Sequence, residues 1–342
     1  MNKSIKILIT GGLGFIGVNL IDLLLAKTNY EILNIDKITY ASNKKFINSK
    51  KNKKYKFKQI DICDYKKTNL IISRFKPDKI IHLAAETHVD RSIKDSMNFF
   101  NSNIFGTYNL LVSSKNYFEN LSSKKKSQFV FFYISTDEVY GDLSHSKTPS
   151  KESDILNPSS PYSASKASSE LLVKAWNRTY NLPYLISRTT NNFGPYQNKE
   201  KLIPNTIDSL LNKKSVSIYG NGSQIRDWIF VRDNAEAIFL ILENNKKNCV
   251  YNISSGNYIT NLYLVKTIYK KLEHKIKKNQ YKIVLKKHFI KFVTDRAGHD
   301  KKYYVNSNKI KKDLKWKTKT DFDEAIDLTI DWYLDKYIVK NK

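Results

Sequence analysis

The sequence predicts an α/β fold, in which a doubly wound parallel sheet is followed by a smaller C-terminal mixed α/β lobe. Two observations support this prediction. Short apolar runs alternate with longer helical patterns through residues 1–188, which is typical of a parallel sheet with helices on both faces. Beyond residue 188, turn-forming pairs such as Gly194-Pro195 become frequent, which indicates a second, smaller unit.

Strands and helices are expected to alternate up to residue 188, and three further helices are expected at 204–211, 234–243 and 262–272 in the second half. The expected strands are Ile5–Ile9, Glu31–Asp36, Lys79–Ala84, Phe129–Ser135 and Tyr184–Arg188; the expected helices are Val18–Lys27, Lys66–Phe75, Ser102–Phe118, Ser163–Tyr180, Pro204–Leu211, Asn234–Glu243 and Leu262–Leu272. Because strand–helix–strand crossovers are right-handed, a doubly wound sheet is the leading topology. We expect one domain at 1–188 and a lobe at 189–335, with the chain returning to the first sheet within 225–260.

The chain is strongly basic, with 59 Lys and Arg residues against 32 acidic ones and a formal net charge of +27. Basic chains can bind nucleic acid, but no motif of a nucleic-acid-binding module accompanies this charge. We interpret the lysines as solvated surface and expect no nucleic-acid partner, although their summed field attracts anionic substrates. The two cysteines and six scattered histidines show no ligand spacing, so we expect neither a disulfide nor a metal.

The apolar runs also bear on location. None approaches the ~20 residues that a membrane helix needs, and the first run meets glycines too early for a signal peptide. We therefore expect a cytoplasmic protein without a membrane partner.

A glycine pattern, TGGLGFIG (10–17), lies between the first expected strand and the first helix. Glycines permit a tight turn and let backbone amides approach a pyrophosphate at the start of a helix. The second strand ends at Asp36, and an acid there accepts hydrogen bonds from ribose hydroxyls and repels a 2′-phosphate. The pattern predicts a Rossmann-type site that prefers NAD to NADP.

Tyr162 and Lys166 are spaced i, i+4 at the start of an expected helix and therefore share one helix face. An ammonium close to a phenol stabilises the phenolate and lowers its pKa from about 10. The pair alone is a common coincidence. After a dinucleotide pattern it indicates that Tyr162 is a base able to deprotonate an alcohol as hydride leaves.

Two adjacent carboxylates follow the most apolar strand, where FVFFYIS (129–135) runs directly into Thr136-Asp137-Glu138. A solvated turn is the plain alternative. Successive side chains of a strand face opposite ways. Both carboxylates can therefore face one ligand only if the backbone becomes irregular just after Ser135.

These features together resemble the extended short-chain dehydrogenase/reductase family and, within it, the dTDP-glucose 4,6-dehydratases. The matching stretches are TGGLGFIG (10–17), HLAAETHVDRSI (82–93), STDEVYGD (135–142), NPSSPYSASKASSE (157–170), RTTNNFGPYQNKEKLIP (188–204), YGNGSQIRDWIFVRDNAEAI (219–238) and DRAGHDKKYYVNSNKI (295–310). They span nearly the whole chain, and segments 119–127 and 274–290 match least.

The resemblance implies a hydro-lyase that oxidises a sugar at C4, eliminates water across C5–C6 and reduces C6, for deoxysugar biosynthesis such as that of rhamnose. It implies that Tyr162 takes the C4 hydroxyl proton while Lys166 binds the nicotinamide ribose. It assigns Glu138 as the C5 base, Asp137 as the acid for the C6 hydroxyl and Thr136 as a hydrogen-bond partner near O4. Such an acid and base need pKa values pushed apart, which two crowded, partly buried carboxyls tend to provide.

The resemblance also implies the binding residues, with NAD as cofactor and dTDP-glucose as substrate. The expected cofactor residues are Gly11, Gly14, Phe15, Ile16, Gly17, Asp36, Lys37, Thr39, Asp61, Ile62, Leu83, Ala84, Ala85, Thr87, Ser102, Tyr162, Lys166 and Asn192. The expected substrate residues are Thr87, Thr136, Asn191, Lys201, Leu202, Tyr219, Arg226, Asn261, Arg296 and His299. Arg226 is the best candidate for the diphosphate, because a guanidinium binds phosphate oxygens bidentately, and Tyr219 is expected to pack on the base.

Two positions depart from the family pattern. Ala297 stands where the family usually has proline, and Thr190 replaces a commoner serine. As in the family, helices 102–118 and 163–180 are expected to form a four-helix bundle between the subunits of a homodimer.

Two alternatives remain open. A UDP-sugar 4-epimerase or decarboxylase of the same superfamily shares the cofactor site, but an epimerase needs neither a C5 base nor a C6 acid, so Asp137-Glu138 disfavours it. A non-catalytic Rossmann protein that binds RNA is supported only by the charge.

Overall fold

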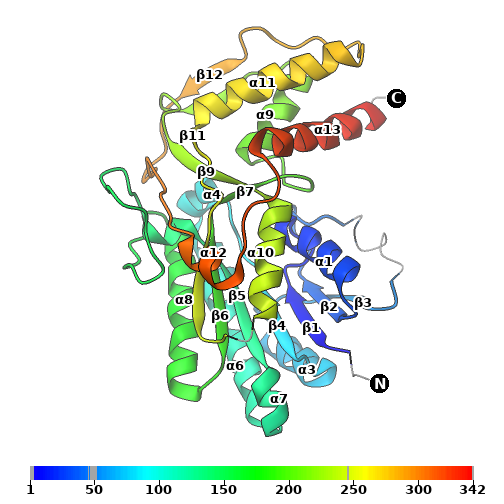
Figure 1. Ribbon diagram of the computed structural model, residues 1–342, viewed down its shortest axis with the longest axis vertical. Coiled ribbons are helices and arrows are strands. Elements are labelled where there is room, and N and C mark those ends of the chain that lie inside the picture. The colour runs from blue at the N-terminus through cyan, green and yellow to red at the C-terminus, as the bar shows by residue number, and fades with distance from the viewer. Residues whose placement is uncertain (1–3, 45, 47–51, 245, 341–342) are drawn as a thin grey trace.

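The computed structural model describes residues 4–44, 46, 52–244 and 246–340. Its centre is a seven-stranded sheet in the order β10-β6-β5-β4-β1-β2-β3 (Figure 1), in which every neighbouring pair is parallel. The strands are β1 (Lys6–Thr10), β2 (Glu31–Asp36), β3 (Tyr55–Gln59), β4 (Lys79–His82), β5 (Val130–Thr136), β6 (Tyr184–Thr189) and β10 (Cys249–Ile253). The predicted doubly wound α/β fold is confirmed.

The strand order reverses between β1 and β4. From β1 the chain builds outward through β2 to β3, and then starts again on the other side of β1 with β4, β5 and β6. In open parallel sheets the two sets of crossover connections diverge at such a point, which leaves a crevice at the carboxyl ends of the strands. The topology therefore predicts a binding site at this edge of the sheet.

Alternation along the strands explains why helices cover both faces. On β1, Ile7 and Ile9 join one apolar cluster, which includes Val18 of α1, while Leu8 joins the opposite cluster, which includes Leu110 of α6. Helices α1 (Phe15–Lys27) and α10 (Val231–Glu243) cover the first face; α3 (Tyr65–Phe75), α6 (Gly106–Glu119) and α8 (Pro161–Tyr180) cover the second. Shorter elements between β4 and β5 are α4 (Val89–Lys94), α5 (Ser96–Phe99), the π-helical η1 (Phe100–Phe105) and α7 (Ser123–Gln128).

The expected helix 102–118 is not uniform. Its first part is the π-helix η1, and α-helical geometry begins only at Gly106. A Cβ at Gly106 would lie 2.6 Å from the Ile62 side chain, so the helix approaches the loop after β3 closely. This contact joins segments far apart in the sequence, which local periodicity does not reveal.

A second apolar core underlies the C-terminal lobe at the top of Figure 1. It is built from helices α9 (Leu202–Leu211), α11 (Asn261–Lys278) and α13 (Phe322–Lys340), a sheet of β7 (Asn191–Phe193), β9 (Ile225–Phe230) and β11 (Tyr258–Thr260), and the pair β8 (Val216–Tyr219) and β12 (Ile290–Val293). The lobe is not a closed segment of the chain, because α10, β10 and α12 (Asn308–Leu314) pack with the first sheet. The division at residue 188 stays a prediction. Within the described ranges, no helix has the length and apolarity needed to span a bilayer.

Candidate active site

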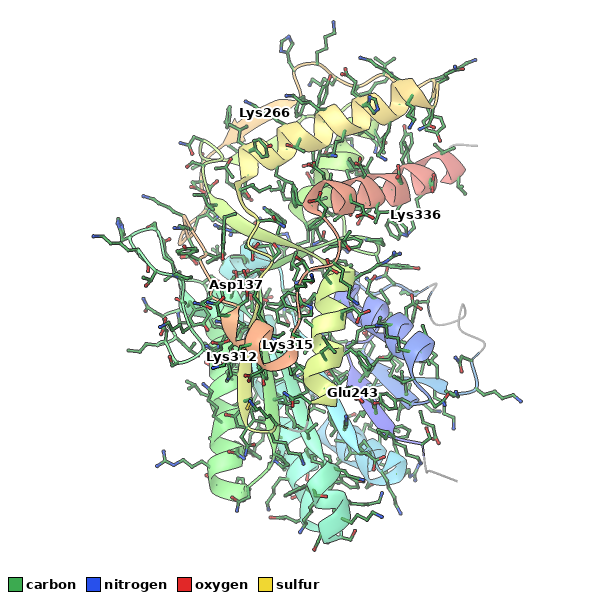
Figure 2. All side chains as sticks on the ribbon, in the orientation of Figure 1. Asp137, Glu243, Lys266, Lys312, Lys315 and Lys336 are labelled. Atoms are coloured by element: carbon green, nitrogen blue, oxygen red, sulfur yellow. The ribbon has the colours of Figure 1, made fainter. Side chains whose placement is uncertain are left out.

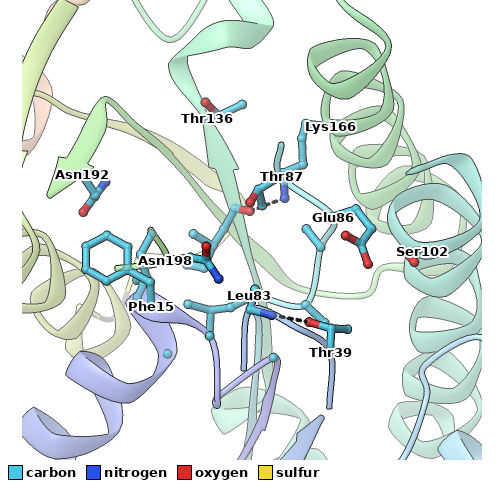
Figure 3. Close-up of a pocket in the computed structure, with 18 of the residues that line it drawn as sticks. Phe15, Thr39, Leu83, Glu86, Thr87, Ser102, Thr136, Lys166, Asn192 and Asn198 are labelled. Carbon is cyan, nitrogen blue, oxygen red and sulfur yellow. Dashed lines mark hydrogen bonds between the residues drawn. The ribbon is translucent and has the colours of Figure 1, made fainter. Parts of the chain in front are cut away.

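A cleft of about 280 Å³ opens at the carboxyl ends of the central strands, where the topology predicts a binding site. Every residue predicted to bind the cofactor lines it, and so do Thr136, Asp137 and Glu138. Figure 3 shows Phe15 and Ser102 on opposite walls of this cleft. The sheet edge thus brings together residues from both sides of the point where the strand order reverses.

The β1–α1 turn matches a pyrophosphate in shape and in donors. Gly11 has a φ of +71°, and a Cβ there would lie 2.5 Å from the Ala84 backbone nitrogen. A Cβ on Gly17 would lie 2.6 Å from the Gly11 carbonyl oxygen. Helix α1 begins after Gly14 without a side-chain cap, so its first backbone N–H groups face the cleft and are available to an anion.

Asp36 is fixed at the end of β2 by three hydrogen bonds. It accepts them from the backbone nitrogens of Leu13 at 3.1 Å and Ile38 at 2.8 Å, and from the Ser42 hydroxyl at 3.2 Å. Burial raises its pKa, although these bonds oppose the shift. The carboxylate is therefore held in place where a ribose of a bound dinucleotide would lie.

Tyr162 and Lys166 lie in the first turns of α8, which begins with a capping box made by Ser160 and Ser163. Both side chains are buried. The Lys166 ammonium donates to the Ile134 carbonyl oxygen at 2.7 Å and lies 4.3 Å from the centroid of the Tyr133 ring. Burial lowers the pKa of Lys166 to about 7.

The expected effect of the lysine on Tyr162 is not found in the ligand-free chain. The pKa of Tyr162 is raised well above its ordinary value, chiefly by burial and then by the negative charge of Glu138. The Lys166 ammonium is directed to the strand carbonyl instead. The prediction of a lowered phenol pKa is therefore wrong for the ligand-free chain.

The backbone becomes irregular close after Ser135, which is the condition for Asp137 and Glu138 to face one ligand. Strand β5 ends at Thr136, and residues Asp137–Tyr140 form a single 3₁₀ turn, η2. The Thr136 hydroxyl accepts from the Glu138 backbone nitrogen at 3.3 Å and also lies 3.3 Å from Asp137 Oδ1. Asp137 consequently lies where the sheet meets the lobe (Figure 2), in the same cleft as Glu138.

The surroundings of the two carboxyls differ in charge. The pKa of Asp137 is raised well above its ordinary value by burial, then by the neighbouring charges of Glu138 and Asp227. Burial also raises the pKa of Glu138, but Arg296, Arg226 and Lys201 oppose that shift. Arg226 also opposes the shift of Asp137, but Glu138 has Arg296 and Lys201 in addition, so these surroundings favour a proton on Asp137 over one on Glu138. The two groups titrate as a coupled pair.

The lobe contributes the opposite wall. Lys201 is the N-cap of α9, and its ammonium donates to the Thr87 carbonyl oxygen at 2.8 Å. Asn191 Oδ1 is buried and has no hydrogen-bond partner among the described residues. Thr87, Thr136, Asn191 and Lys201 are the predicted substrate residues that line the cleft.

Arg226 makes contacts that the sequence did not suggest. Its guanidinium donates to the carbonyl oxygens of Asp300 at 2.7 Å and Ile225 at 2.8 Å, and lies 4.2 Å from the centroid of the Tyr303 ring. In the ligand-free chain Arg226 therefore holds the segment after β12 against β9. The predicted diphosphate role of Arg226 stays a prediction.

Three further predicted substrate residues form a cluster around Asp90 of α4. The Tyr219 hydroxyl donates to Asp90 at 3.0 Å, and Arg296 forms an ion pair with Asp90 at 3.3 Å. The His299 ring packs edge-on against the Tyr219 ring, with 5.9 Å between the ring centroids. They do not line the central cleft, and neither do Leu202 and Asn261, the first residues of α9 and α11.

Two groups that are not predicted from the sequence face this chemistry. The Tyr303 hydroxyl lies 2.8 Å from Asp300 Oδ2 and 3.3 Å from Glu138 Oε2. Glu200 lines the cleft, and it accepts from the Tyr40 hydroxyl at 2.9 Å and pairs with Arg91 at 3.2 Å. Both residues lie inside stretches that matched the family, but no spacing rule assigns them a partner so far away in sequence.

The fold and the site define the class of protein: a dinucleotide cleft with a Tyr–Lys pair on the helix after β5 is the arrangement of short-chain dehydrogenases/reductases. A family model described as GDP-mannose 4,6 dehydratase matches residues 8–329. A dTDP-glucose 4,6-dehydratase of Haemophilus influenzae is 44% identical over 96% of this chain and 98% of its own length, and one of Neisseria meningitidis is 43% identical over 96% and 93%. The chain belongs to this family of nucleotide-sugar 4,6-dehydratases.

Solved structures agree with this assignment. A dTDP-glucose 4,6-dehydratase of Streptomyces venezuelae, solved with NAD bound, superposes with a TM-score of 0.88 at 32% identity over 98% of each chain. A UDP-glucose 4-epimerase of Thermotoga maritima has a TM-score of 0.83 at 26% identity over 97% and 100%. The fold is therefore shared with epimerases.

We predict that Gly11→Ala reduces both stability and retained dinucleotide. The left-handed backbone costs an alanine about 1–2 kcal/mol, and the added Cβ also overlaps the Ala84 backbone. Gly256→Ala is the matched control, because Gly256 also has a positive φ, +88°, but no atom lies within 4 Å of its added Cβ. Denaturant unfolding and the dinucleotide content of the purified protein report the difference; equal losses in both variants would contradict the close approach at Gly11.

We also predict that Asp137→Asn stabilises the fold at neutral pH. Because its pKa is raised in the folded chain, the carboxyl destabilises the fold increasingly as pH rises above the ordinary aspartate value of about 3.9. The stability gain of the variant should therefore grow as the pH rises above about 4. Denaturant unfolding across this range measures it.

Asp142→Asn is the control of opposite sign. Partial burial of Asp142 raises its pKa, but backbone N–H groups of Lys302, Ser144 and Lys301 lower it by more, so the net shift is downward. Asp142 therefore stabilises the fold above its unfolded pKa, and Asp142→Asn should lose stability at neutral pH but not in acid. A pH-independent effect of Asp137→Asn would contradict the buried, protonated carboxyl.

Proposed function

We propose that this chain converts dTDP-glucose to dTDP-4-keto-6-deoxyglucose. The observation that supports this most directly is the η2 turn, which puts Asp137 and Glu138 into the same cleft as Tyr162 and Lys166. A cleft with only the Tyr–Lys pair suffices for alcohol oxidation. An additional acid and base beside it match a reaction that also eliminates water.

NAD is the proposed cofactor, and the cleft has the features that it requires. The uncapped start of α1 offers N–H donors to a pyrophosphate, and the fixed carboxylate of Asp36 disfavours a 2′-phosphate. When bound, NAD accepts the hydride from sugar C4 and returns it to C6. Lys166 is placed to bind the nicotinamide ribose, and it can give up its present bond to Ile134 for that purpose.

The first proton transfer is assigned to the phenolate of Tyr162, which takes the proton of the C4 hydroxyl. The phenol pKa is raised in the ligand-free chain, so we assign stabilisation of the phenolate to Lys166 once its ammonium has turned from the Ile134 carbonyl oxygen. The buried position of Tyr162 keeps water away from the reacting alcohol, and Thr136 beside it is placed to hold O4. The oxidised C4 then makes the C5 proton acidic.

The elimination is assigned to the carboxyl pair. Glu138 takes the C5 proton, and Asp137 gives its proton to the C6 hydroxyl, which leaves as water. The different surroundings of the two groups favour this division, because Asp137 has the more strongly raised pKa and Glu138 faces three cationic side chains. A base and an acid are thus available together at one pH.

A UDP-sugar 4-epimerase or decarboxylase is the weaker candidate. The fold does not distinguish it, since a UDP-glucose 4-epimerase superposes with a TM-score of 0.83. An epimerase has no use for a proton donor beside C6, and the buried Asp137 would then carry a stability cost without a function.

The proposed function predicts that the purified protein, incubated with dTDP-glucose, forms a 4-keto-6-deoxy product with its alkali-induced chromophore. Asp137→Asn should slow elimination by about 100-fold or more while C4 oxidation continues, since a general acid contributes that much. Bound NADH, followed by its near-ultraviolet absorbance, should then accumulate in the variant. Absence of product from NAD-loaded, folded wild type would contradict the proposal, and equal loss of both steps would contradict the role of Asp137.

We also propose a homodimer formed by α6 and α8 through a four-helix bundle. Large apolar side chains are exposed on these helices and on the preceding η1, among them Phe105, Tyr108 and Leu171 at 58%, 45% and 59%. Tyr108 packs edge-on against Trp176 of α8, so the two helices present one continuous face. Such a face is typical of a subunit interface.

A cytoplasmic location remains a prediction.

Leu171→Asp should convert this dimer to monomers, because a charge in the centre of an apolar interface is not paired. Phe292→Asp is the control, since Phe292 is similarly exposed, at 55%, but lies on β12 in the lobe. Sedimentation velocity distinguishes the two species. A monomeric wild type, or equal dissociation by both variants, would contradict the proposed interface.

A further inference from the structure

A fully buried ion pair lies behind the two catalytic elements. Arg188 of β6 and Glu170 of α8 have side chains exposed by only 1% and 0%. Arg188 Nε lies 3.1 Å from both carboxylate oxygens of Glu170, and Nη2 lies 2.7 Å from one of them. Burying two charges is costly, and excellent geometry is needed to offset it.

The remaining nitrogen of the same guanidinium, Nη1, contacts the catalytic turn. It donates to the Tyr140 hydroxyl at 2.6 Å and to the Glu152 carbonyl oxygen at 3.2 Å. The Tyr140 hydroxyl in turn lies 2.8 Å from Asn252 Oδ1 on β10. Arg188 therefore connects α8, β6 and β10 with the residue that closes η2.

The turn has other anchors at its start and middle: the Thr136 hydroxyl accepts from the Glu138 backbone nitrogen, and the Val139 carbonyl oxygen accepts from the Asn157 backbone nitrogen at 2.9 Å. The ladder between β5 and β6 ends at the pair Thr136 and Thr189, so residues 137–140 lie beyond the sheet. Their last residue, Tyr140, packs with Val139 against Ala167 of α8, which directly follows Lys166. Tyr140 is the residue of the turn that packs on α8 and also bonds to the buried ion pair, so it helps to set the position of the carboxylates relative to this helix.

We propose that Arg188 and Tyr140 are positioning residues for the elimination step. On one side, Arg188 holds Glu170, one helical turn after Lys166 on the helix that also carries Tyr162. On the other side, it holds Tyr140, at the end of the turn that carries Asp137 and Glu138. A single buried cation thereby sets the distance between the groups of the oxidation step and those of the elimination step.

This inference rests on the proposed function, and it predicts an asymmetry between the two steps. The oxidation groups belong to a long helix with many other contacts, whereas the elimination groups belong to one short turn. Loss of the hydrogen bond between Arg188 and Tyr140 therefore displaces the two carboxylates more than it displaces Tyr162. A displacement of about 1 Å can cost on the order of 100-fold in rate.

Tyr140→Phe tests the inference, because it keeps the ring packing and the ion pair and removes only the hydroxyl. In single turnovers with dTDP-glucose, bound NADH should form within about twofold of the wild-type rate, while the 4-keto-6-deoxy product should form about tenfold or more slowly. The KM for the sugar nucleotide should be unchanged. Tyr251→Phe is the matched control: its ring is buried on β10, and its hydroxyl binds Asp313 at 3.1 Å, away from the cleft.

Arg188→Lys provides a second measurement, because a lysine retains the charge but cannot hold Glu170 and Tyr140 at once. It should show the same excess of bound NADH over product as Tyr140→Phe. Equal slowing of both steps in Tyr140→Phe, or the same asymmetry in Tyr251→Phe, would overturn the positioning role. Failure of the wild type to form product would instead overturn the proposed function, so the two failures are distinguishable.

Discussion

The burial of two adjacent carboxyls at the end of β5 is the constraint on which the rest of the site depends. Charged forms of such groups are unstable away from water unless other groups compensate. The compensating cations, Arg226, Arg296 and Lys201, come from the lobe rather than from the sheet that carries the carboxyls. The acid–base chemistry therefore exists only when the two cores are assembled on one another.

The parallel sheet explains why so many functional side chains meet without a dedicated scaffold. All seven strands end at the same edge, and the loops after β1, β2, β4, β5 and β6 all reach the cleft. The order reversal beside β1 opens the crevice in which a dinucleotide can lie. Loop sequence can then vary the chemistry over one unchanged sheet, which is consistent with the close superposition of an epimerase.

Much of this could be predicted from sequence, because it depends on local pattern. Apolar runs located the strands, the glycine pattern located the start of α1, and the spacing of Tyr162 and Lys166 placed both on one helix. What failed was contact between distant segments. The sign of the Tyr162 pKa shift depends on Glu138 and on burial, and Tyr303 meets Glu138 across 165 residues of sequence. Neither arrangement leaves a periodic signal in the chain.

The addition of β10 at the edge of the sheet has a consequence for biosynthesis. The outer edge of β6 pairs with residues 249–253, which the ribosome adds only after β7, α9, β8, β9 and α10. Until then the nascent N-terminal half exposes the unpaired edge of β6, and until residues 231–243 are added one sheet face also lacks helix α10. Such edges are templates for association with other chains. The emerging polypeptide should therefore depend on chaperone protection until the last parallel strand has been synthesised.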